Sequence, residues 1–296
     1  MIKRLGKLVN KCIEPSGFKF SRVPKKDTWE SKVSVWQLPA GEFAEERKYW
    51  FAKMTAFYQQ EYGLSVLPIQ SDPAIVPPLE IVGATQFPDT SMPDAFLFNG
   101  CQKSIEYLTE LRDHGCDVRQ MKNILEFGVG FGRLIVHYLP FAVNLYGCDV
   151  TESTLNWTKK ALGDKVRLSL TELNPPLPYE SGFFDYIYAQ SVFTHIPCST
   201  AEAWIAELFR ILKPGGMLII SIFDASYFFS SHSHRDFDHN WEAKGCHCYD
   251  EHLGVRMGTY LSQGHVRKMI KPFGEVLEIR SHFRDQSHVV ARKAAR

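Results

Sequence analysis

The sequence predicts an α/β fold in which a mainly parallel sheet is covered by helices on both faces. Between residues 123 and 223, short apolar runs alternate with segments of helical periodicity, which is typical of parallel strands joined by crossover helices. Residues 265–270 then indicate one more helix, and residues 275–283 and 288–293 indicate a closing antiparallel pair of strands. The core of the fold is therefore expected beyond residue 115.

The part before residue 116 is predicted to be a basic arm followed by a helical and proline-rich cap. Apolar and aromatic side chains recur near helical spacing in residues 41–62 and again in residues 101–112. Between them, the prolines of residues 64–95 indicate an irregular, stiffened segment that can serve as a lid over a binding site. The predicted division is 1–115 for arm and cap and 116–296 for the core, with a substrate lid at about 224–265.

The most informative stretch is NILEFGVGFGR, residues 123–133. Its apolar first half is a candidate buried strand, and Gly128, Gly130 and Gly132 follow at alternate positions before a helix-capable segment at 134–139. Glycine permits a positive φ and a close approach of the backbone, and amides at the start of the next helix can then face a ligand. The alternative is a glycine-rich strand-to-helix turn that binds nothing.

A second indication of a cofactor site lies about twenty residues downstream, where a dinucleotide-type fold carries its acid. Residues 145–149 favour a strand that ends in Asp149, where the ribose hydroxyls of a nucleoside cofactor need acceptors. A nicotinamide oxidoreductase is the obvious competitor. The third glycine of its G-x-G-x-x-G pattern would fall at Arg133, so this alternative is disfavoured.

The stretch EFGVGFG, residues 126–132, resembles the E/D-x-G-x-G-x-G signature of class I S-adenosylmethionine-dependent methyltransferases. Three later stretches are similar, in order, to that family's third strand, fourth strand and helix–turn–fifth strand: 166–172, 184–191 and 210–223. The resemblance covers roughly residues 122–223 and extends to the C-terminus through the predicted closing strands. It implies a seven-stranded Rossmann-like sheet, parallel with a C-terminal antiparallel strand and with helices on both faces.

The resemblance also implies a cofactor, S-adenosylmethionine, and a product, S-adenosylhomocysteine. By matching position, the three glycines would pass the backbone under the methionine part, and Glu126 would fix the loop and the ammonium end. Asp149 would accept from the ribose, while Glu172 and Leu173 would frame the adenine. The cofactor-binding residues implied in this way are Glu126, Gly128, Gly130, Phe131, Gly132, Arg133, Asp149, Val150, Glu172, Leu173, Ala189, Gln190 and Ser191.

Methyl transfer from a sulfonium is an in-line displacement, so the protein mainly has to align the reacting atoms in a dry pocket. The expected acceptor is an oxygen or nitrogen of a small molecule such as a sugar or natural-product intermediate. His195, just past the fourth strand, is the candidate base or positioning group for an alcohol acceptor. The alternative for His195 is a loop histidine that is hydrogen-bonded to the backbone. The alternative for the whole protein is a non-catalytic subunit that binds the cofactor and regulates or scaffolds a partner.

The Asn174-Pro175-Pro176 run resembles only superficially the Asn-Pro-Pro-Tyr signature of amino-group methyltransferases. That signature belongs after the fourth strand, whereas this run follows the third. Methylation of nucleic-acid base amines is therefore disfavoured. The net charge of +1 agrees, because it gives no general reason to expect a nucleic-acid partner.

The segment at about 224–265 is rich in histidine, aromatic and acidic residues and is expected to read the substrate. The predicted substrate-binding residues are Tyr227, Phe228, His232, His234 and Trp241. Its H-x-H and C-x-C spacings do not match a zinc-finger pattern, so no metal is expected. A polar substrate lid is the preferred interpretation.

The cysteines and the N-terminus bear on location. Seven scattered cysteines, an odd number, favour reduced thiols and a cytoplasmic protein over a disulfide framework. No run reaches the roughly 18 apolar residues of a membrane span, and the N-terminus lacks the pattern of a signal peptide. Residues 1–32 carry nine lysines and arginines against three acids, which leaves open a peripheral contact with a membrane surface or a partner.

Overall fold

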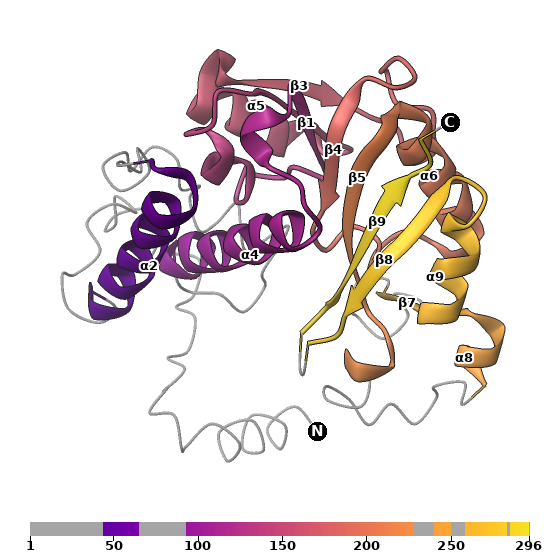
Figure 1. Cartoon of the computed structure of the whole chain (residues 1–296). Coiled ribbons are helices and arrows are strands. Elements are labelled where there is room, and N and C mark those ends of the chain that lie inside the picture. The colour runs from indigo at the N-terminus through magenta and orange to yellow at the C-terminus, as the bar shows by residue number, and fades with distance from the viewer. Residues whose placement is uncertain (1–43, 65–92, 228–239, 250–257, 283–284, 296) are drawn as a thin grey trace, which may run out of the picture.

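The computed structural model describes residues 44–64, 93–227, 240–249, 258–282 and 285–295, and its centre is a seven-stranded sheet (Figure 1). The strands are β1 (Asn123–Phe127), β2 (Asn144–Asp149), β3 (Val166–Leu170), β4 (Phe184–Ala189), β5 (Leu212–Ile222), β8 (Gly274–Arg280) and β9 (Ser287–Lys293). Their order is β3-β2-β1-β4-β5-β9-β8. The first five strands are parallel, and β9 runs antiparallel between β5 and β8, which confirms the predicted fold class.

Helices cover both faces of the sheet because successive strand residues point to opposite sides. Ile124 belongs to one apolar cluster and its neighbour Leu125 to the other. The first cluster includes side chains of α2 (Ala44–Tyr62), α4 (Pro93–Asp113), α5 (Glu152–Leu162) and the 3₁₀ helix η6 (Ile135–Tyr138). The second includes side chains of α6 (Cys198–Ile211) and α9 (Gln263–Ile270), as Figure 1 shows on the other side of the sheet. Two further 3₁₀ helices are η5 (Val118–Gln120) and η7 (Gly163–Lys165).

Several boundaries differ from the predicted ones for local reasons. Helix α4 begins at Pro93, eight residues earlier than predicted, and proline suits the first turn of a helix because that turn does not need its amide. The predicted helix-capable segment at 134–139 narrows to η6. Strand β3 ends at Leu170 and not at the predicted residue 172, so Glu172 follows the strand, as Leu173 does.

The predicted helix over residues 41–62 is present as α2, which ends where expected. Gly63 follows with φ +67°, and its amide donates to the carbonyl of Gln59. Met54 and Tyr58 are fully buried against the first apolar cluster, with Phe57 packed beside them. The buried face of α2 is set by packing against helix α4 and, at Tyr58, by stacking on the Phe141 ring.

A second, two-stranded sheet lies in the region predicted as a substrate lid. Strands β6 (Cys246–Tyr249) and β7 (Gly258–Leu261) pair in antiparallel fashion, and the four-residue helix α8 (Trp241–Lys244) precedes them. The main sheet meets β7 through a bridge between Phe223 and Tyr260. The amide of Thr259 also donates to the carbonyl of Thr194, in the loop after β4.

The expectation that all the cysteines are reduced is wrong for two of them. Cys198, at the start of α6, forms a disulfide with Cys246 of β6, and their Cα atoms are 6.0 Å apart. The two residues are 48 positions apart in sequence, so only the packing of β6 against α6 brings them together. An odd cysteine count argues against a complete framework of bridges but does not exclude a single one.

Some predictions fall outside the described residues. These are the basic arm at 1–32, most of the proline-rich segment at 64–95, and Phe228, His232 and His234. A cytoplasmic location and the division of the chain at residue 115 also stay predictions. Across the part of the chain that the structure describes, no helix combines the length and apolar character needed to cross a membrane.

Candidate functional site

The loop after β1 turns sharply at three glycines. Gly128, Gly130 and Gly132 have φ values of +78°, +49° and +79°, a region that other residues rarely occupy. A Cβ atom on Gly128 would also overlap Cγ2 of Val192. The amide of Gly128 donates to the carbonyl of Cys148 at 2.8 Å, which holds the loop against the end of β2. The predicted cradle is therefore a backbone path that requires glycine.

The acid at the end of β2 belongs to the same arrangement. Oδ2 of Asp149 accepts a hydrogen bond from the amide of Gly130, and Oδ1 accepts one from the amide of Thr151, each at 2.9 Å. Each carboxylate oxygen has a second lone pair, and the side chain is partly exposed, so it can still accept from a ligand. From α5, the hydroxyl of Thr158 donates to the carbonyl of Gly130 at 2.7 Å. The loop and the acid are thus held as one unit.

Glu126, near the end of β1 and just before the glycine loop, has almost no exposed surface. Burial raises its pKa to about 8, although the Arg133 guanidinium and the hydrogen bond from Tyr188 lower it. The hydroxyl of Tyr188 donates to Oε2 of Glu126 at 3.2 Å. Arg133 is itself buried, and burial lowers its pKa. This carboxyl and this guanidinium are thus buried near each other, just before and just after the glycine loop.

The end of β4 carries a closed ring of hydrogen bonds. Ser191 has φ +59°, and its amide donates to Oγ of Ser221 at 2.7 Å. The hydroxyl of Ser221 donates to Oε1 of Gln286 at 2.6 Å, and Nε2 of Gln286 returns to Oγ of Ser191 at 2.7 Å. Since a non-glycine residue at positive φ is strained, this ring explains how Ser191 is held at the sheet's carboxyl edge.

Four residues that support this site were not predicted. Ser221 and Gln286 complete the ring around Ser191, and Tyr188 binds Glu126. The hydroxyl of Tyr107 donates to Oε1 of Gln190 at 2.5 Å. Ser221 and Tyr188 lie within strands that the sequence predicted, but no local pattern marks Gln286 or Tyr107. They reach the site from the C-terminal strand pair and from α4.

Apolar side chains are exposed where the adenine is predicted to bind. Among the described residues, three large hydrophobic side chains are strongly exposed: Val150 (49%), Leu170 (55%) and Leu173 (75%). All three follow or end β2 and β3, beside the acid of β2. The indole N–H of Trp204 donates to the carbonyl of Leu173 at 3.2 Å, which ties that segment to α6. These apolar side chains are thus accessible on the side of Asp149 where the adenine is predicted to bind.

Two predicted cofactor residues have side chains that face the protein interior. The ring of Phe131 has no exposed surface and packs edge-on against Trp157. The Arg133 side chain is also buried, as described above. Glu172, by contrast, is exposed next to Leu173. Phe131 and Arg133 can therefore contribute to a ligand site through backbone atoms and through the loop's shape.

His195 lies on a loop that is fixed from below. Its side chain is exposed, and its amide donates to the carbonyl of Val192 at 2.9 Å. Strand β7 holds the same loop, because Thr259 donates from its amide to the Thr194 carbonyl and from its hydroxyl to the Ile196 carbonyl. The position at the carboxyl edge of the sheet matches the predicted one, and the catalytic role stays a prediction.

Two of the predicted substrate residues, Tyr227 and Trp241, are described by the structure, and both belong to one small aromatic cluster. The Tyr227 ring stacks on Phe223 with centroids 4.0 Å apart. Trp241 is only 4% exposed and meets Tyr260 edge-on, with centroids 5.9 Å apart. Trp241 thus mainly closes a small apolar cluster, whereas Tyr227 keeps part of its surface exposed. A substrate contact from either residue stays a prediction.

Residues 125–220 match the family model described as a methyltransferase domain. Over 118 residues the chain is 26% identical to phosphoethanolamine N-methyltransferase 2 of Caenorhabditis elegans, covering 38% of this chain and 26% of that protein. Over 132 residues it is 27% identical to sterol 24-C-methyltransferase erg6 of Schizosaccharomyces pombe, covering 42% and 34% of the two. The chain therefore spans well under half of the length of either relative.

Among solved structures, the PH0226 protein from Pyrococcus horikoshii OT3 has a similar fold. The TM-score is 0.52 at 16% sequence identity, and the match covers 65% of this chain and 90% of the other. At this identity the likeness concerns the fold alone.

Proposed function

We propose that this chain, whose residues 125–220 match the model of a methyltransferase domain, transfers a methyl group from S-adenosylmethionine to a small molecule. The acceptor atom is an oxygen or a nitrogen. The observation that carries the proposal is the joined unit of the glycine loop and Asp149. A backbone that requires glycine, next to a partly exposed carboxylate at the end of the second strand, suits a nucleoside with free ribose hydroxyls.

The residues present fit this cofactor at two further places. The exposed apolar surface of Val150 and Leu173 lies beside Asp149, where an adenine attached to the ribose would reach. At Gly128 a Cβ atom would collide with Val192, so only glycine lets the loop pack this closely against the segment after β4. Apolar surface for the base and a carboxylate for the sugar are the two demands of a nucleoside ligand.

The bound cofactor supplies a methyl group on a positively charged sulfur, and the chain's own residues supply alignment. Asp149 would accept from the ribose, and the glycine loop, which is bonded to Asp149 through the amide of Gly130, would position the remainder. His195, when neutral, accepts the proton of an alcohol acceptor. Since the displacement is in line and needs no metal, orientation and exclusion of water account for most of the rate.

The acceptor is a small molecule such as a sugar or natural-product intermediate. His195, whose loop is tied to β7 through Thr259, is exposed and so is open to such an acceptor. The two curated relatives are named for an N- and a C-methyltransferase, so the family membership leaves the acceptor atom open.

Two measurements test the proposal in sequence. Isothermal titration calorimetry with S-adenosylhomocysteine should show one site per chain, and NADH should show none. Incubation with methyl-labelled S-adenosylmethionine and a panel of hydroxyl and amine compounds should then label at least one of them. No binding of S-adenosylhomocysteine would contradict the cofactor site, whereas binding without any labelled product would favour a non-catalytic cofactor-binding subunit.

A further inference from the structure

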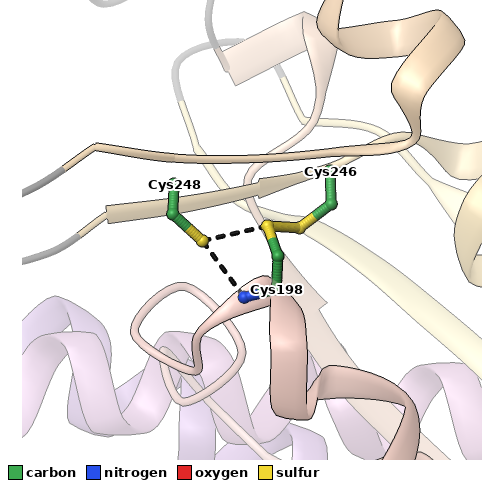
Figure 2. A group of neighbouring side chains, drawn as sticks. All are labelled: Cys198, Cys246 and Cys248. Carbon is green, nitrogen blue, oxygen red and sulfur yellow. Dashed lines mark hydrogen bonds between the residues drawn. A yellow bond between two sulfur atoms is a disulfide. The ribbon is translucent and has the colours of Figure 1, made fainter.

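Three cysteine sulfurs meet where β6 packs against the start of α6 (Figure 2). Cys246 and Cys248 are two positions apart on β6, so their side chains lie on the same face of the strand. Both face Cys198, the first residue of α6. Cys198 is bonded to Cys246, and Sγ of Cys248 lies 2.9 Å from Sγ of Cys198.

Cys248, the cysteine of this cluster that is not in the disulfide, has partners suited to a reactive sulfur. The amide of Cys198 donates to Sγ of Cys248 at 3.1 Å, and this amide belongs to the first turn of α6, where partial positive charge collects. Oγ1 of Thr259 lies 3.4 Å from the same sulfur. The only hydroxyl hydrogen of Thr259 is directed to the carbonyl of Ile196, so its oxygen can accept the thiol proton of Cys248.

We propose that Cys198, Cys246 and Cys248 form a thiol–disulfide exchange site with two alternative disulfides. The thiolate of Cys248 attacks Sγ of Cys198, a Cys198–Cys248 bond forms, and the Cys198–Cys246 bond breaks. The electron pair leaves with Cys246 as a thiolate, and the proton lost by Cys248 is taken up there through solvent. Charge and electrons balance within the three residues, so no external oxidant or reductant takes part.

The other described cysteines lack this chemistry. Burial raises the pKa of Cys101 to about 12 and that of Cys148 still further, so both remain protonated thiols. Cys116 is partly exposed, and its sulfur neighbours are the His114 carbonyl and the Arg292 guanidinium, not another sulfur. Within the described chain, a sulfur in contact with the disulfide is found at Cys248.

The exchange would change the position at which strand β6 is joined covalently to helix α6. The Cys198–Cys246 bond fixes the beginning of β6 to α6, and the Cys198–Cys248 bond would fix the strand two residues further along, about 7 Å at the rise of a β-strand. Cys198 directly follows the loop that carries His195. The exchange does not depend on methyl transfer, and mass spectrometry detects it without any measurement of methyl transfer.

Mass spectrometry of protein purified without reductant tests the proposal. The folded protein is held at mildly alkaline pH, quenched in acid, denatured and treated with N-ethylmaleimide. Tandem spectra of the tryptic peptide between Lys244 and Arg256 then show which cysteine was free. We expect label on Cys246 in some molecules and on Cys248 in others, with populations within about tenfold of each other because both bonds close the same strand onto the same helix end. Label on Cys248 alone would overturn the proposal.

Two single variants make the test independent of that equilibrium. Cys246→Ser should still form a disulfide, now between Cys198 and Cys248, and Cys248→Ser should keep only the bond between Cys198 and Cys246. Cys116→Ser is the control and should leave the labelling pattern unchanged. Two free thiols in oxidised Cys246→Ser protein would overturn the proposal. So would purified protein in which all three residues are free thiols that hold stoichiometric zinc, since a metal site would then explain the cluster.

Discussion

Oδ2 of Asp149 accepts the backbone amide of Gly130 at 2.9 Å. This hydrogen bond joins the end of β2 to the middle of the glycine loop after β1. The carboxylate and the loop of the predicted cofactor site are therefore held together. A change at Asp149 therefore removes an acceptor for a ligand and at the same time loosens the loop.

Asp149→Ala should weaken binding of S-adenosylhomocysteine by at least about tenfold, since hydrogen bonds to a charged acceptor each contribute roughly 1.5–3 kcal/mol. Asp149→Asn should lose less, because the amide keeps one oxygen that can accept from Gly130 or from the ribose. Calorimetric titration of each variant measures the effect. The control is Asp164→Ala, an exposed acid whose ion-pair partner among the described residues is Lys159. Unchanged affinity in Asp149→Ala would refute this placement of the ribose.

Gly128→Ala and Gly163→Ala form a matched pair. Both glycines have positive φ, +78° and +60°, so alanine is strained at either position, by about 1–3 kcal/mol. At Gly163 a Cβ meets nothing within 4 Å, whereas at Gly128 it collides with Val192. Gly128→Ala should therefore lose about 1–3 kcal/mol more in free energy of unfolding, the usual cost of overpacking.

Urea denaturation of the two glycine variants gives the stability difference, and titration with S-adenosylhomocysteine gives the affinity. Gly163→Ala should bind like the unmodified protein, and Gly128→Ala should bind more weakly because its loop is displaced. Equal stability and equal affinity of the two variants would show that the loop has room for a side chain and is no tight cradle.

His195→Ala should lower kcat by about 10²-fold or more while leaving cofactor affinity unchanged, the scale of a lost general base. The measurement uses an acceptor found in the labelled screen. His114→Ala is the control. His114 directly follows the C-terminal end of α4, and its side chain is hydrogen-bonded to Glu278 of β8. Full turnover in His195→Ala would exclude the base role, and an amine acceptor that needs no protein base would then be favoured.

Glu110 gives a prediction for the pH dependence of stability. It lies buried with its Oε1 atom 2.7 Å from Nδ1 of His288, and burial raises its pKa to about 8 against the lowering effect of Arg280. Because the folded pKa exceeds the unfolded one, the folded state keeps a proton that the unfolded chain has lost. The stability that this carboxyl contributes is full below its unfolded pKa and is lost as the pH rises through about 8.

The free energy of unfolding of the unmodified protein, minus that of Glu110→Gln, should therefore fall between about pH 5 and pH 8, by a few kcal/mol at most. Asp185→Asn is the matched control. Burial alone would raise the pKa of Asp185, but hydrogen bonds from Lys213 and from the amide of Asn123 lower it overall. The contribution of Asp185 to the free energy of unfolding therefore changes only at acid pH. Urea denaturation at several pH values measures both differences. A rising difference for Glu110→Gln would contradict the prediction.

The sequence was informative where function depends on neighbouring residues in the chain. Strands alternate with helices at their own periods, and a loop that needs positive φ at three places records this need as glycine. The strands, the glycine loop and Asp149 were predictable for that reason. Helix starts were less so, as at Pro93, because packing decides how far a helix extends.

The rest was decided by contacts between distant parts of the chain. Gln286 reaches Ser191 across 95 positions, and Tyr107 reaches Gln190 across 83, with no pattern near either residue to indicate it. The disulfide between Cys198 and Cys246 contradicted the expectation from cysteine count for the same reason. Periodicity and turn chemistry are local properties that a sequence displays directly. Which side chains meet across the sheet's carboxyl edge depends on how the helices and the C-terminal strands pack, and only the folded chain decides this.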